Sequence, residues 1–231
     1  MRRNTSPLGF SLLEMAIVLI VVGLLLGSAA SSFVQLVEFK KIEKNKQELE
    51  LIRDALINYA VLNQRLPCPA ALSSKGLSAK QSDSEACLNP NGGYVPAVEL
   101  GLSEVTDQGL ILDAWNRPIK YAVTQENSYA YVTKEGVKNN FKTGINPNLR
   151  VCAGNTTSNS SCMGSMVLTD SSPAVVYSSG PNGIFESHLN ESLSAFVYHE
   201  STSADSYLGE FDDQLVWISN PVLIGRMVQT W

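Results

Sequence analysis

The chain has 231 residues and a mass of 25.1 kDa, a length that fits one or two domains. Charged residues make up 17% of it and apolar residues 44%, a composition that excludes a disordered chain and a coiled coil. The formal net charge of −5 and the pI near 5.1 argue against a basic nucleic-acid binder, so no nucleic-acid partner is expected.

The N-terminus joins a short basic segment to a long apolar run. Arg2 and Arg3 precede residues 10–37, in which Glu14 is the only charged residue. A run of about 20 apolar residues can span a membrane, and the preceding arginines predict a cytoplasmic N-terminus. A cleaved secretory signal has a shorter apolar core of about 7–15 residues, although residues 28–30 imitate a cleavage site and leave that interpretation open.

Glu14 is the residue that an ordinary membrane anchor does not explain. A carboxylate near the bilayer centre costs about 2.5–3.5 kcal/mol on insertion scales. Such a residue indicates a functional site and needs a partner of opposite charge.

The sequence around Glu14 resembles a known processing site. Leu8 and Gly9, followed by residues 10–18 (FSLLEMAIV), resemble the cleavage site of type IV pilins and of the pseudopilins of type II secretion. The resemblance implies that prepilin peptidase cuts between Gly9 and Phe10 and that Phe10 is then N-methylated. Glu14 matches the family's glutamate, which we expect to pair with the free amine of a neighbouring subunit and so to fix the register of assembly.

Four segments follow from this interpretation. They are a leader peptide at 1–9, a transmembrane or filament-core half-helix at 10–37, an amphipathic half-helix at 38–63 and an extracytoplasmic β-rich head at 64–231. Apolar residues at helical spacing predict one helix from about Phe10 to about Asn63, ended by Pro67 and Pro69.

In the head, short apolar runs between turn residues predict strands. The expected strands are Ile119–Thr124, Ser128–Lys134, Met166–Leu168, Ala174–Ser178, Phe196–His199 and Gln214–Ser219. The predicted fold is α+β and pilin-like: a long N-terminal α-helix packed against an antiparallel β-sheet head with disulfide-stapled loops.

Two stretches of the head strengthen the resemblance. Residues 63–70 with 92–96 and 100–102 resemble a subgroup of long, cysteine-containing prepilin-like proteins, and residues 112–121 are similar to the Asp-Pro-Trp-Gly-Asn-Pro-x-x-Tyr stretch of major pseudopilins. Ala114, Asn116 and Arg117 depart from that pattern. We interpret Trp115 and Tyr121 as core residues that pack on the helix, in preference to an aromatic binding site.

Four cysteines lie beyond the apolar run. Sequence proximity favours the disulfides Cys68–Cys87 and Cys152–Cys162, each closing a loop rich in small polar residues, although four cysteines allow three connectivities. The spacings are not those of a zinc site, so disulfides in an oxidising compartment are preferred to a metal.

The sequence offers no catalytic motif. His188 and His199 stand outside any triad or metal pattern, and the chain has neither a nucleophile elbow nor a phosphate loop. No enzyme activity and no required cofactor are expected. A calcium site is an alternative, with Asn182, Asp212 and Asp213 as oxygen ligands. A solvated turn, or a loop held by hydrogen bonds from backbone N–H groups to a carboxylate, is favoured over it.

The resemblance to pilins and pseudopilins implies a structural subunit, a minor pilin or minor pseudopilin, of a type IV pilus-like filament. Its expected partners are prepilin peptidase, other pilin or pseudopilin subunits and an inner-membrane assembly platform. The expected location is the bacterial inner membrane, with the head in the periplasm, and then a filament or the cell surface. Two alternatives stay open: an adhesin-like binding module on such a filament, and a membrane-anchored extracytoplasmic protein with an unrelated activity.

Overall fold

The structure is a computed structural model that describes residues 11–154, 162, 166–185, 194–200, 202 and 211–230. Within these ranges the side chains of residues 25–35 and 143 are not described. Gly9, Phe10 and His188, which the sequence analysis singled out, lie outside the described residues. The chain divides into two compact units, Met1–Glu43 and Lys44–Trp231, and each is considered by itself.

One helix, α1 (Leu12–Asn63), runs for 52 residues. Its start agrees with local chemistry, because the Ser11 hydroxyl accepts a hydrogen bond from the Leu13 backbone N–H at 3.3 Å. Its end coincides with Gln64, which adopts a positive φ of 57°, just ahead of Pro67. These bounds lie within two residues of the expected Phe10 and Asn63.

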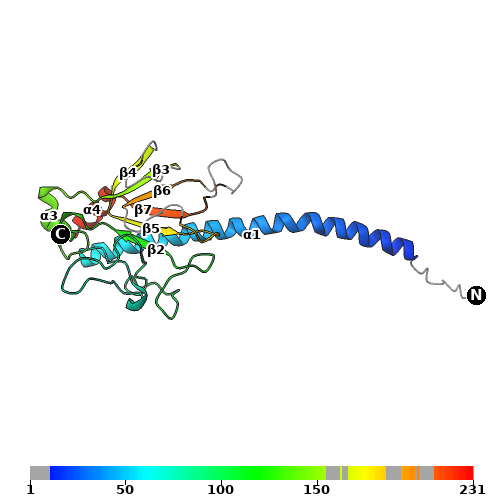
Figure 1. The fold of residues 1–231 in the computed structure, drawn as a ribbon, viewed down its shortest axis with the longest axis horizontal. Helices are drawn as coiled ribbons and strands as arrows, with labels where there is room; N and C mark the ends of the chain where they lie inside the picture. The colour runs from blue at the N-terminus through cyan, green and yellow to red at the C-terminus, as the bar shows by residue number, and fades with distance from the viewer. Residues whose placement is uncertain are drawn as a thin grey trace, which may run out of the picture. The chain divides into compact units, whose positions relative to one another are not determined.

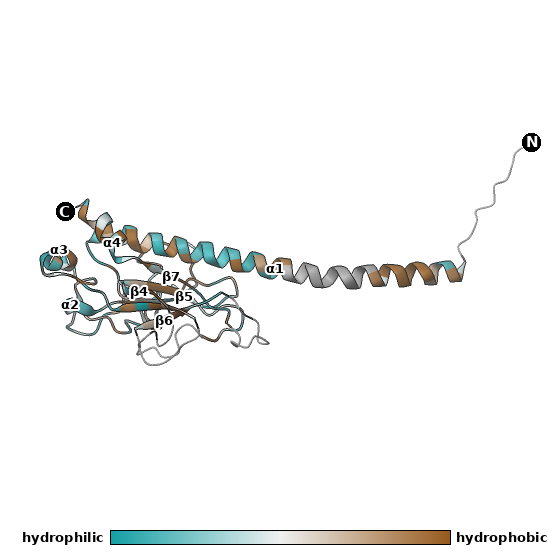
Figure 2. Cartoon of the chain, turned by 90° about the horizontal axis from the view of Figure 1, so that it is seen from above, coloured by the Kyte–Doolittle hydropathy of each residue, from teal (hydrophilic) through white to brown (hydrophobic). Residues whose placement is uncertain are grey.

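In the first unit, the described side chains of residues 11–24 are all exposed. Most are apolar, as the brown colour near the start of α1 in Figure 2 indicates. Leu12 is 92% exposed and Leu24 is 71% exposed. The sequence analysis predicted a membrane-crossing segment over 10–37. No helix among the described residues is both long enough and apolar enough to cross a membrane.

The second unit contains two sheets (Figure 1). The first is fully antiparallel, with the order β1 (Gly93–Tyr94), β2 (Lys120–Val123), β5 (Ala174–Ser178) and β7 (Gln214–Ile218). The second has the order β4 (Met166–Ser172), β3 (Leu149–Ala153) and β6 (Ala195–Tyr198). In it β3 pairs antiparallel with β4 and parallel with β6.

Short helices complete the second unit. They are the 3₁₀ turns η1 (Leu72–Ser74) and η2 (Phe141–Thr143) and the helices α2 (Glu126–Tyr129), α3 (Gly136–Asn140) and α4 (Asn220–Val228). Proline in the first turn of α4 is favourable, since its missing N–H would have no partner inside the helix.

Side chains of the first sheet alternate between two apolar clusters. Tyr121, Val123 and Val176 join a cluster that also holds residues of α1. Ala122, Val175 and Tyr177, the neighbours of those residues along β2 and β5, join a second cluster. That second cluster also holds Leu149 and Val151 of β3 and Phe196 of β6. The first sheet is therefore covered on both faces, and every residue of β5 is buried.

The part of α1 in the second unit contributes four residues to this core: Leu49, Ile52, Leu56 and Ala60, each at most 1% exposed. A buried polar residue lies on the same part of the helix. Asn45 is 1% exposed, and its amide Nδ2 donates to Gln214 Oε1 at 3.0 Å, which ties the helix to the start of β7.

The predicted fold, one long helix packed against an antiparallel sheet, is wrong. The head holds two sheets, and the second contains a parallel pair. The unit that contains both sheets begins at Lys44, within α1. A parallel pair needs a long connection, here one that includes β4 and β5, and short-range turn signals do not reveal it.

The individual strand predictions had mixed outcomes. The range Ala174–Ser178 is reproduced by β5, and β2, β4, β6 and β7 overlap their predicted ranges. The strand predicted at Ser128–Lys134 is wrong. Asn127, Ser128 and Tyr129 have φ between 55° and 64°, which no strand allows, although Tyr131 and Val132 are buried. Strands β1 and β3 were not predicted.

The buried stripe of α1 can be tested by mutation. Replacement of Leu56, which is 0% exposed, by alanine leaves a cavity and is expected to lower the free energy of unfolding by about 3 kcal/mol. Leu62→Ala is the matched control, because Leu62 is 82% exposed on the same helix and its loss should change stability by less than about 0.5 kcal/mol. Urea unfolding of both variants gives the comparison, and equal effects would contradict the packing described.

Candidate functional sites

Glu14 lies in the first turn of α1 and its side chain is exposed. A carboxylate there interacts favourably with the unpaired N–H groups at the start of a helix. The structure gives Glu14 no hydrogen bond or ion pair with any described residue. Its expected partner, the amine of Phe10 in a neighbouring subunit, and the expected cleavage site after Gly9 lie outside the described residues.

Both predicted disulfides are confirmed. Cys68 bonds to Cys87, and Cys152 bonds to Cys162, so the described residues include no free cysteine. The first disulfide is fully buried at both cysteines and lies in the core cluster that includes the residues of α1. The second joins Cys152 of β3 to Cys162.

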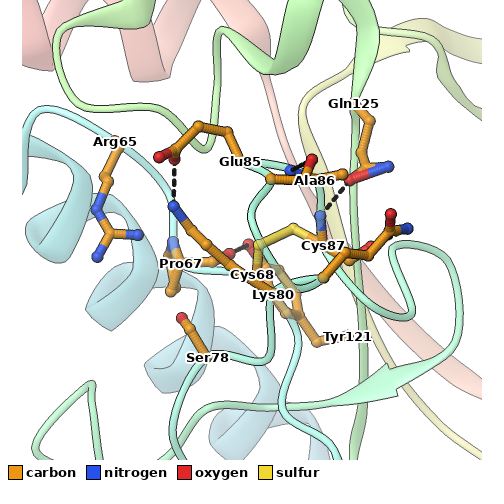
Figure 3. The surroundings of a disulfide bond; sticks show 12 residues. Arg65, Pro67, Cys68, Ser78, Lys80, Glu85, Ala86, Cys87, Tyr121 and Gln125 are labelled. Carbon is orange, nitrogen blue, oxygen red and sulfur yellow. Dashed lines mark hydrogen bonds and ion pairs between the residues drawn. A yellow bond between two sulfur atoms is a disulfide. The ribbon is translucent and has the colours of Figure 1, made fainter.

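The Cys68–Cys87 disulfide fastens a loop that has little regular structure of its own (Figure 3). Cys87 donates its backbone N–H to Gln125 Oε1, and Lys80 pairs with Glu85 within the closed loop. The Tyr121 hydroxyl donates to the Pro67 carbonyl at 3.2 Å, and burial raises the pKa of that phenol well above its ordinary value. The Tyr121 hydrogen bond thus ties β2 to the segment that follows α1, next to the disulfide.

A network of polar side chains lies beside this loop. Glu99 accepts hydrogen bonds from the Tyr59 hydroxyl and, at 2.7 Å, from the Ser78 backbone N–H. Arg65 donates to the Tyr59 hydroxyl at 3.0 Å and pairs with Glu99 at 3.4 Å. The network therefore joins Tyr59 of α1, Arg65 two residues past its end and two loop segments.

The network shifts two titrations. Burial opposes ionisation of Glu99, but the hydrogen bonds from Ser78 and Tyr59 and the charge of Arg65 outweigh it and hold the pKa of the Glu99 carboxyl below its ordinary value. Burial, the hydrogen bond to Glu99 and the Glu99 charge together raise the pKa of Tyr59 to about 12. Nothing in the sequence indicates this network, since Tyr59 and Glu99 are 40 residues apart.

The stretch that resembles pseudopilins, residues 112–121, forms a turn centred on Asp113. Its Oδ1 accepts the backbone N–H groups of Trp115 and Arg117 at 2.9 and 2.8 Å, and its Oδ2 accepts the Ser178 hydroxyl at 2.7 Å. Tyr121 is fully buried as expected, whereas Trp115 is only half-buried. The Arg117 guanidinium donates to the carbonyls of residues 180 and 181, so this turn also positions the loop after β5.

The three calcium candidates lie close together. Asp212 Oδ2 accepts the backbone N–H of Asn182 at 2.9 Å, and Asp212 and Asp213 are both buried. Gly180 packs against the same residue, because a Cβ there would lie 2.3 Å from the Asp212 carbonyl oxygen. The described residues include no group of three or more His, Cys, Asp or Glu that could hold a metal ion. In this geometry the Asp212 carboxylate holds the loop after β5 in place by accepting the Asn182 backbone N–H.

Of the two histidines, the structure describes His199. Its side chain packs edge-to-face against Phe211, with ring centroids 5.6 Å apart, and its Nδ1 contacts the Glu200 carbonyl. These contacts place it near the end of β6 without a carboxylate partner among the hydrogen bonds and ion pairs described. Its contacts give no indication of general-base chemistry.

In comparisons with known proteins, no family model, curated protein or solved structure matches the chain.

The contribution of the Cys68–Cys87 disulfide can be measured. Its cysteines are 19 residues apart and those of Cys152–Cys162 are 10 apart, so the chain-entropy model assigns the first the larger effect, about 3 kcal/mol. We expect Cys68→Ala/Cys87→Ala to lower the free energy of unfolding by about 3–5 kcal/mol, because a buried contact is lost as well. Cys152→Ala/Cys162→Ala is the control, and a larger loss in that variant by urea unfolding would contradict the ranking.

The Glu99 network predicts a dependence of stability on pH. Because the folded carboxyl has a lowered pKa, its stabilisation is complete above the ordinary value of 4.5 and is lost as the pH falls through the folded pKa. We expect Glu99→Gln to lower the free energy of unfolding by about 1–3 kcal/mol at pH 7. The free energy of unfolding of this variant should also fall less steeply as the pH decreases. Glu50→Gln removes an exposed carboxylate as the control. If unfolding midpoints between pH 7 and 3 change equally in both variants, the network has no such role.

Proposed function

We propose that this chain is a structural subunit, a minor pilin or minor pseudopilin, of a type IV pilus-like filament. The observation that carries the proposal is the position of Glu14: it lies in the first turn of a 52-residue helix, five residues after Gly9, in a stretch whose other described side chains are mostly apolar and exposed. The chain is long for a major subunit of such filaments, which favours a minor one.

The exposed start of α1 supports an assembly role. A contiguous apolar surface of this kind is unfavourable in water and marks a surface that another molecule or a membrane covers. In a bundle of such helices a carboxylate would need a counter-charge, and the amine of Phe10 created by cleavage after Gly9 would supply it from a neighbouring subunit.

The proposal includes a route to the filament. Prepilin peptidase would cut after Gly9 on the cytoplasmic side, and an inner-membrane assembly platform would then incorporate the subunit, with the head in the periplasm. The two disulfides support this location for the head, because disulfides form and persist in oxidising compartments such as the periplasm.

Glu14→Ala tests the assembly step. We expect the variant to be cleaved normally but incorporated into filaments at least tenfold less than the wild-type chain, because it lacks the carboxylate that pairs with the neighbouring amine. Sheared filaments and membrane fractions are compared by immunoblot. Glu43→Ala makes the same change farther along the helix and should incorporate normally. Normal incorporation of Glu14→Ala would contradict the proposed role of this carboxylate.

A further inference from the structure

A small cavity in the second unit lies between α1 and the loop that leads to β2. Its volume is about 30 Å³, and the polar residues that line it are Lys44, Asn45 and Glu48 of α1 with Glu104 and Asp113 of the loop. A larger cavity of about 330 Å³ shares Lys44, Glu104 and Asp113 with it. The small cavity therefore adjoins a wider space from which water and ions can reach it.

Asn45 supplies a buried oxygen that no described residue satisfies. The side chain is 1% exposed and lines the cavity, and its Nδ2 donates to Gln214, which does not line it. The Asn45 Oδ1 atom accepts no hydrogen bond from the described residues. A buried carbonyl oxygen in this state is unfavourable unless a water molecule or an ion meets it.

Two carboxylates at the cavity repel each other. Glu48 lies three residues after Asn45 on the same face of α1, and Glu104 lines the cavity from the loop. Burial, the largest cause, and the charge of Glu104 raise the pKa of the Glu48 carboxyl, whereas the charge of Lys44 lowers it. Lys44 is exposed and forms no ion pair with the described residues. Asp113 adds a third carboxylate, which already accepts three hydrogen bonds.

We propose that this cavity binds one calcium ion through Asn45 Oδ1 and the carboxylates of Glu48 and Glu104, with water as the remaining ligands. Amide and carboxylate oxygens are ligands that calcium takes, and its flexible coordination accepts them from two separate elements. A water molecule would satisfy the Asn45 oxygen but would leave the repulsion between the carboxylates in place, which favours a cation. Two carboxylates set the affinity in the weak range of about 10⁻⁴–10⁻³ M.

The bound ion would fasten the loop before β2 to α1. This site is separate from the loop after β5, which the sequence analysis considered for calcium, and it has two carboxylates and an amide as ligands. The inference does not depend on assembly into a filament.

The test measures the Tm of the full chain in detergent, first with EDTA and then with calcium chloride. We expect about 10 mM calcium to raise the Tm by about 3–10 °C, since that concentration is about 10–100 times the Kd. Magnesium at the same concentration should raise it by less than half as much, because magnesium demands octahedral geometry and loses its water reluctantly. No rise with calcium, or an equal rise with magnesium, would overturn the proposal.

Three variants assign the effect to this cavity. Glu48→Gln should remove most of the rise with calcium, yet it should not lower the Tm in EDTA, because it removes the repulsion from Glu104. Lys44→Gln removes a nearby positive charge and should lower the Kd for calcium, measured by isothermal titration calorimetry. Glu50→Gln is the matched control, because Glu50 is exposed on the same helix outside the cavity. A full rise in Glu48→Gln, or an equal loss in Glu50→Gln, would contradict the site.

Discussion

Burial of one apolar stripe of α1 is the interaction on which the second unit depends. Leu49, Ile52, Leu56 and Ala60 occupy the same cluster as side chains from β2, β5 and β7. Because the opposite face of that sheet packs on the second sheet, loss of the helix would expose a sheet whose strands are apolar on both faces. Residues 11–24, at the described start of the same helix, are all exposed.

The loops between α1 and β5 depend on polar contacts more than on regular structure. The Cys68–Cys87 disulfide, the Glu99 network and the Asp113 turn each join residues that are far apart in sequence. Together they fix the end of α1 to the first sheet and position the loop after β5. Their chemistry is structural, and none brings together a nucleophile, a base and an oriented partner.

The sequence predicted local features well and long-range ones poorly. The spacing of apolar residues predicted the helix Leu12–Asn63 and the prolines after it predicted its end. The proximity of the cysteines along the chain predicted both disulfides. The second sheet was missed because β3 holds Arg150 and pairs with distant segments, and a parallel pair leaves no turn signal. The run AVVY in β5 was a usable sign, since a strand without polar residues is typical of burial on both faces. The Glu99 network depends on tertiary contacts that the spacing of residues along the chain does not reveal.

The central claim is that the chain is processed as a prepilin, and the most direct measurement is the intact mass of its N-terminus after extraction from membranes. Mass spectrometry is performed on protein from cells with and without prepilin peptidase. The account predicts a chain that starts at N-methylated Phe10 when the peptidase is present and at Met1 when it is absent. A chain that starts at Met1 in both cells, or one that is cut near Ala30, would contradict the claim.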